Sequence, residues 1–176
     1  MEIMKKLIIT LLAVMMITSL TACGSKKETA EVKKLEGTCS EIIDKVYEHK
    51  EVDLSLETTE LDLTDLDAFK MYTGLQDADK VSEAAVSEPI IGSIPYSMVM
   101  LRVKDAADTE EVANAMKSGI NQRKWVCVEA DDLAVAAYGD VVMLFMVGSD
   151  YNDEITSAEM VEFFKDVCGG TLSLQL

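Results

Sequence analysis

The sequence has very few of the side chains and motifs on which common enzyme mechanisms depend. It contains a single histidine, His49, which lies near the end of a predicted helix and is interpreted as a surface residue at the helix end. It contains no GxSxG or SxxK motif, no GxxxxGK[ST] phosphate loop and no GxGxxG loop. Because nucleophilic catalysis usually needs a base, often histidine, we assign no catalytic residues.

Cysteines are few and widely separated. Outside the N-terminal segment there are three, Cys39, Cys127 and Cys168, and no CxxC pair that would suggest a zinc or redox motif. An odd count outside the cell implies at least one free thiol or an intermolecular bond. Cys127 lies among strand-forming residues and is predicted to be a small core hydrophobe. A Cys39–Cys168 bridge between two helices is the alternative to free thiols.

Metal-binding patterns are incomplete. Asp150, Asn152 and Glu154 alternate as they do in an EF-hand loop, but Ile155 and Val161 stand where glycine and the closing glutamate are needed. The segment is therefore interpreted as a polar loop before a helix. We expect no metal site and no cofactor.

Basic residues are also scarce, with 16 Lys and Arg against 32 Asp and Glu, a net charge of −16. A surface of this charge repels nucleic acid. We therefore expect no nucleic-acid partner.

The N-terminus has the features of an export signal. Lys5 and Lys6 precede an apolar run over residues 7–20, which is too short to span a bilayer comfortably. Leu20, Thr21 and Ala22 then lead to Cys23, an arrangement that resembles the bacterial lipobox. The pattern predicts cleavage by signal peptidase II before Cys23 and attachment of diacylglycerol to its thiol.

Lipidation would place the protein on the outer face of the cell membrane. Each buried methylene contributes about 0.8 kcal/mol, so two or more acyl chains anchor a protein firmly. We predict three regions: a signal peptide over residues 1–22, a lipid-anchored flexible linker over 23–37, and a single domain over 38–176. Lysines in the linker can lie against anionic headgroups.

The remaining sequence predicts an α+β domain. We expect a two-layer fold, with an antiparallel sheet of four to five strands and about three helices mainly on one face. The expected helices cover residues 38–50, 66–72, 109–120 and 156–168, of which the second is short. The expected strands cover 82–89, 96–104, 125–128, 133–138 and 141–147, with a Gly139-Asp140 hairpin turn and capping boxes at Thr38 and Thr156.

One stretch carries basic and aromatic residues in an acidic protein. Arg123, Lys124 and Trp125 form a candidate recognition patch that could bind an anionic partner by charge and stacking. The alternative, which we favour, is a structural role: Trp125 packs in the core, and the two cations either snorkel to the surface or pair with Asp131 and Asp132.

Two segments resemble a known family. "SEPIIGSIPYSMVMLRVKDAADTEEV" and "RKWVCVEADDLAVAAYGDVVMLFM" are similar to lipoproteins of the domain of unknown function family 4358. The resemblance extends over residues 39–168 and is strongest at the strand ending in "VKD" and at the W-x-C-V passage. It implies a lipid-anchored extracytoplasmic domain and supplies no catalytic residues.

Together these features predict a membrane-anchored lipoprotein whose domain binds a partner protein of the envelope or a small ligand. The alternative is a hydrolase that uses carboxylates without histidine on an envelope substrate. Such an enzyme needs a cleft with two convergent acids and perturbed pKa values, which a binding module does not need.

Overall fold

The structure, a computed structural model, describes residues 34–176. The predicted signal peptide, the lipobox with Cys23 and most of the linker lie outside the described residues. The elements follow in the order α2 (Cys39–Tyr47), β1 (Leu56–Glu60), α3 (Leu66–Thr73), β2 (Val81–Pro89), β3 (Tyr96–Val103), η1 (Ala106–Asp108), α4 (Thr109–Gly119), β4 (Asp132–Tyr138), β5 (Val141–Val147), η2 (Ser149–Tyr151), α5 (Ser157–Val167) and β6 (Leu174–Gln175).

The strands of the described chain form one antiparallel sheet in the order β1-β2-β3-β5-β4-β6. β3 and β5 lie at its centre, and β1 and β6 form its edges. The α+β class and the antiparallel sheet are as predicted. The numbers of elements differ from the prediction: the described residues contain six strands and four α-helices, where four to five strands and about three helices were expected.

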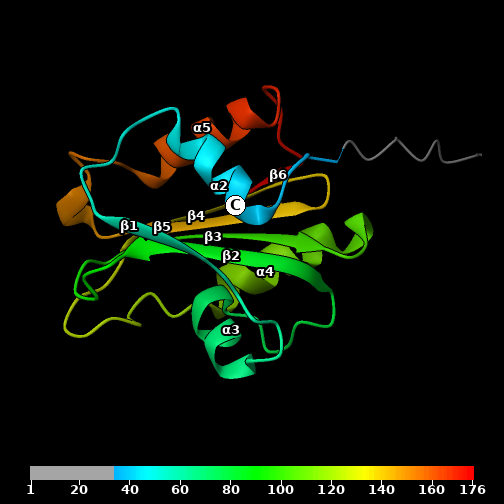
Figure 1. Ribbon diagram of the computed structural model, residues 1–176, viewed down its shortest axis with the longest axis horizontal. Helices are drawn as coiled ribbons and strands as arrows, with labels where there is room; N and C mark the ends of the chain where they lie inside the picture. The colour runs from blue at the N-terminus through cyan, green and yellow to red at the C-terminus, as the bar shows by residue number, and fades with distance from the viewer. Residues whose placement is uncertain (1–33) are drawn as a thin grey trace, which may run out of the picture. The chain divides into compact units, whose positions relative to one another are not determined.

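Helices cover both faces of this sheet, so the predicted two-layer arrangement is wrong. α2 and α5 lie on one face, and α3 and α4 lie on the other (Figure 1). The reason is visible in β3, where Met98 and Met100 face the first helix pair while Val99 and Leu101 face the second, and all four are buried. A strand that is apolar on both faces needs a cover on both.

The predicted local signals are present. Thr38 and Thr156 each form a complete capping box, with Glu41 and Glu159 respectively. Gly139 adopts a φ of +60° in the two-residue connection between β4 and β5, as a tight hairpin requires. Turn and capping chemistry is therefore encoded locally in this chain.

Three parts of the sheet differ from the prediction. Residues 125–128, expected to form a strand, lie in an irregular loop between α4 and β4. Cys127, expected in the core, is exposed in that loop with a φ of +63°. Two strands were not predicted: β1, which is polar and lies at the edge, and β6, whose two residues are too few to show a period.

Arg102 joins the beginning of the domain to the sheet. Its guanidinium lies 2.8 Å from Asp140 Oδ1 and donates to the carbonyl oxygens of Leu35 and Gly37, at 3.0 and 2.7 Å. Its Nε also lies 3.8 Å from a carboxylate oxygen of Glu83. The chain just before α2 is thus fixed to β3 and to the β4–β5 turn.

The ends of α3 and α4 touch through two glycines. A Cβ atom on Gly119 would lie 2.2 Å from the carbonyl oxygen of Gly74, far inside van der Waals contact. Gly74 ends α3 in the left-handed conformation, with a φ of +78°. This close approach fixes the position of α3, and with it Tyr72.

We expect Gly119→Ala to lower the free energy of unfolding by about 2–3 kcal/mol, because backbone must move to admit the methyl group. Gly92→Ala is the matched control, since a Cβ there meets nothing within 4 Å, and it should change stability by less than about 0.5 kcal/mol. Urea titration of the two variants and the parent measures both effects. Equal stability of the two variants would contradict the predicted contact.

Candidate functional site

The structure separates Arg123 from the other two residues of the predicted recognition patch, Lys124 and Trp125, which lie together. The Arg123 side chain is 78% exposed and pairs with Glu129 at 3.0 Å. The Lys124 side chain is only 5% exposed. Trp125 is partly buried and packs against the core between the sheet and α3–α4. The three therefore do not form one continuous charged and aromatic surface.

The carboxylates expected to pair with these cations have other partners. Asp131 accepts hydrogen bonds from the backbone N–H and hydroxyl of Ser149, at 2.6 and 2.7 Å. Asp132 accepts from the backbone N–H of Ser157 at 2.7 Å and also from its hydroxyl. The predicted pairing of Arg123 and Lys124 with Asp131 and Asp132 is wrong, because these aspartates fix the segment that leads into α5.

Lys124 forms an ion pair beneath the surface. Its Nζ lies 2.5 Å from Glu88 Oε1 and donates to Ser97 Oγ at 3.2 Å. Glu88 Oε1 is buried, so this ion pair is shielded from water.

Two aromatic rings enclose the same ammonium group. Nζ lies 4.8 Å from the centre of the Tyr72 ring and 5.1 Å from that of the Trp125 ring. Rings at such distances attract a cation through their quadrupoles, more strongly where water is excluded. We call Tyr72, Glu88, Ser97, Lys124 and Trp125 the lysine cluster.

The cluster draws on four parts of the fold. Glu88 and Ser97 come from β2 and β3, Tyr72 comes from α3, and Lys124 and Trp125 come from the loop before β4. Lys124 and Trp125 were predicted from the sequence as candidate site residues, whereas Tyr72, Glu88 and Ser97 were not. One signal was available: Ala84, Val86 and Glu88 share a face of β2 by strand alternation, so a carboxylate follows two residues that face a core.

Burial alters the acid–base properties of the cluster. It lowers the pKa of Lys124 below the usual range, against the opposing effect of the neighbouring Glu88 carboxylate. Burial, and secondly the charge of Glu88, raises the pKa of Tyr72. A desolvated lysine beside a surface hollow is a feature that is enriched at functional sites.

Such a hollow adjoins the cluster at the β1 side of the sheet. This edge pocket has a volume of about 240 Å³ and is lined by Glu57, Thr59, Leu61, Tyr72, Val86, Glu88, Pro89 and Ile90. Glu88 and Tyr72 belong both to the pocket wall and to the cluster. The pocket thus combines carboxylates, an aromatic ring and aliphatic side chains, with room for one long side chain or a small ligand.

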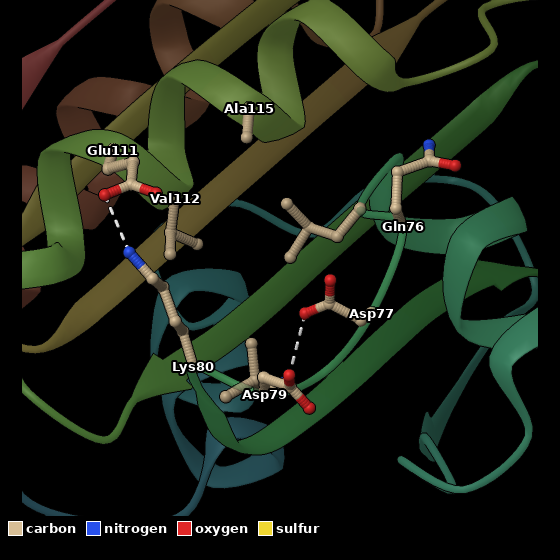
Figure 2. A pocket seen from close by; sticks show the side chains of 9 residues that line it. Gln76, Asp77, Asp79, Lys80, Glu111, Val112 and Ala115 are labelled. Carbon is tan, nitrogen blue, oxygen red and sulfur yellow. Dashed lines mark hydrogen bonds and ion pairs between the residues drawn. The ribbon is translucent and has the colours of Figure 1, made fainter.

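A second hollow lies between α4 and the segment that connects α3 to β2 (Figure 2). Its volume is about 350 Å³, and its lining combines the charged residues Asp77, Lys80 and Glu111 with the apolar residues Leu75 and Val112. Lys80 Nζ lies 2.6 Å from Glu111 and 3.0 Å from Asp108. These are exposed ion pairs of ordinary strength, and the lysine is occupied by them.

A third hollow, of about 560 Å³, lies between the turn after β5 and the loop that carries Cys127. Its carboxylates include Asp131 and Asp150. Two hydrogen bonds from Ser149 lower the pKa of Asp131, which favours its charged form. Within residues 34–176 no three histidine, cysteine or carboxylate side chains converge as a metal site would require.

The other side chains that could take part in chemistry, Cys39, Cys168 and His49, have structural surroundings. Cys39 and Cys168 are buried free thiols, and burial raises the pKa of each to about 12. His49 follows α2, where it stacks on Phe163 at 5.5 Å and lies 4.0 Å from Asp166. Of the two alternatives that the sequence left open for Cys39 and Cys168, the structure has the free thiols.

Comparison with known proteins adds no relative: no family model, no curated protein and no solved structure matches this chain. No helix within residues 34–176 is long and apolar enough to cross a membrane.

We expect Lys124→Met to lower the free energy of unfolding by about 3 kcal/mol, because it leaves the buried Glu88 oxygen without its cation. Lys124→Met combined with Glu88→Leu should recover much of this loss, since both charges are then gone. Denaturant titration of the two variants distinguishes a coupled pair from independent side chains. Additive losses would contradict the ion pair.

Proposed function

We propose that this chain is an extracytoplasmic lipoprotein, anchored through Cys23 to the outer face of the cell membrane. We further propose that its domain is a binding module for a partner protein of the envelope or a small ligand. The lipobox and the export signal support the anchor. The contacts of Arg102 with Leu35 and Gly37 support a tether that ends just before α2.

The lysine cluster carries the proposed binding role. A desolvated ammonium held by Glu88 between two rings costs folding free energy that an apolar cluster of similar volume would not. Desolvated titratable groups with a specific charge partner beside a cleft are enriched at functional sites. The edge pocket opens at this point, so Glu88 and Tyr72 would contact whatever occupies it.

The carboxylates of the described chain give less support to a hydrolase. A general acid in a carboxylate mechanism has a raised pKa. The resolved shifts among the acids within residues 34–176 are downward, at Asp62, Asp131 and Glu159, and in each case the largest cause is a hydrogen bond from a hydroxyl group. These groups fit turn and cap formation better than proton donation to a substrate.

Site-specific photo-crosslinking of the full-length lipidated protein in its own membranes tests the proposal. A photoreactive residue at Thr59, which is exposed and lines the edge pocket, should give one discrete crosslinked product. The same group at Asp77, in the hollow of Figure 2, and at Glu162, on the outer face of α5, should not. Equal yields at all three positions, or none at Thr59, would contradict a binding site at the edge pocket.

A further inference from the structure

β1 presents an open edge along one side of the edge pocket. The N–H of Leu61 donates to Ala84 at 2.8 Å, and Ser55 accepts from Ile90 at 3.0 Å, so odd-numbered residues of this segment bond to β2. By alternation, the backbone groups of Leu56, Thr58 and Glu60 point away from β2. Among residues 34–176 no strand lies on that outer side of β1, which forms the near edge of the sheet in Figure 1.

The side chains beside this edge define the kind of strand that it fits. Glu57 and Thr59 line the edge pocket from β1, and Glu88 lines it from the adjacent strand. Ile90, which pairs with Ser55, also lines the pocket and is 68% exposed. On the α3 face of the sheet, the acidic side chains of Glu57 and Glu88 thus lie next to the exposed aliphatic side chain of Ile90.

We propose that the outer edge of β1 receives an extended basic segment of a partner protein, which adds to the sheet as a further strand. This inference rests on the proposed binding function and names the partner's chemistry. Edge strands bind peptides in this way through main-chain hydrogen bonds, while alternate side chains give specificity. A lysine or arginine opposite Glu57 would lie within about 5 Å of it, and an apolar residue two positions further on would lie opposite Ser55, with Ile90, which follows β2, on the far side of Ser55.

Charge selects a basic partner over a second copy of the chain. The protein carries a net charge of −16, and β1 itself presents Glu57 and Glu60. Two copies joined at this edge would place these glutamates near one another, and like charges on paired strands are destabilising. A segment with positive charge would instead be attracted to these glutamates.

A peptide titration with the full-length lipidated protein in detergent tests this inference. The probe is acetyl-Thr-Val-Lys-Val-Ile-Val-Thr-amide with a fluorophore, which places an apolar residue two positions after the lysine. Thr58→Pro removes an outward N–H without removing a bond to β2, and Thr58→Val keeps that N–H as the matched control. Glu57→Lys reverses the charge at the pocket, and Asp77→Asn changes a distant charge.

We expect binding to the parent and to Thr58→Val, with loss of about tenfold or more in affinity for Thr58→Pro, which loses main-chain hydrogen bonds. Glu57→Lys should lose about fivefold or more through charge repulsion, and Asp77→Asn should change affinity by less than about twofold. Absence of peptide binding, or equal affinity across the variants, would overturn the proposal. So would self-association of the parent that Thr58→Pro abolishes, because the occupant would then be a second copy.

Crosslinking separates this inference from the broader proposal. If the product formed at Thr59 in membranes persists in a Thr58→Pro background, the domain binds a partner but not by strand addition, and only the inference fails. If no product forms at Thr59 in the parent protein, the proposed function itself fails.

Discussion

Arg102→Met should lower the free energy of unfolding by about 3–5 kcal/mol, the largest loss that we expect from a single substitution. The side chains of Arg102 and Asp140 are 16% and 5% exposed. Removal of the guanidinium leaves the Asp140 carboxylate buried without its closest cation. It also removes the donor to the carbonyls of Leu35 and Gly37, which fix the beginning of the domain.

Lys104→Met provides the control for this prediction. Lys104 directly follows β3, and its Nζ makes one exposed hydrogen bond, to the carbonyl of Asp79. Its substitution should cost less than about 1 kcal/mol. Thermal and denaturant unfolding of both variants measures the two effects. A loss of less than about 1 kcal/mol in the free energy of unfolding of Arg102→Met would show that Arg102 does not hold the beginning of the domain to the sheet.

Stability should fall steeply above pH 9 because of Cys39 and Cys168. Burial raises the pKa of each thiol from about 9 to about 12, so the folded state keeps protons that the unfolded state releases. Stability from these groups is complete below pH 9 and is lost as pH rises toward 12. The slope is about 1.4 kcal/mol per pH unit for each thiol in that window.

The double variant Cys39→Ala, Cys168→Ala should therefore lose less stability between pH 9 and 10.5 than the parent does, by about 3 kcal/mol for the pair. Burial also raises the pKa of Tyr47 and Tyr96, so a part of the alkaline loss remains in the variant. Cys127→Ala, which changes an exposed thiol, is the control and should leave the parent's pH dependence intact. Parallel curves for the parent and the double variant would contradict buried thiols.

The sequence predicted those features that depend on local chemistry. Capping boxes at Thr38 and Thr156 and the turn at Gly139 each require particular residues at fixed spacing, and all three are present. The prediction failed where tertiary contacts decide. The second helix layer depends on two apolar faces of β3, and the polar strand β1 depends on its pairing with β2.

The candidate site was harder to predict because its parts are distant in the sequence. Lys124 and Trp125 stood out as a basic and an aromatic residue in an acidic chain. Their partner Glu88 lies 36 positions earlier than Lys124 in the sequence, and no local pattern connects the two. Asp131 and Asp132 are closer to Lys124 in sequence, but backbone and hydroxyl donors before and at the start of α5 bind them instead.

Metabolic labelling with radioactive palmitate tests the central claim, that this is a lipid-anchored extracytoplasmic protein, most directly. The parent protein should incorporate label and sediment with membranes. Cys23→Ala should incorporate none and retain its signal peptide, because signal peptidase II acts on the lipidated cysteine. Cys127→Ala, which keeps the lipobox, should be labelled like the parent. Label in the Cys23→Ala variant, or its absence from the parent, would contradict the account.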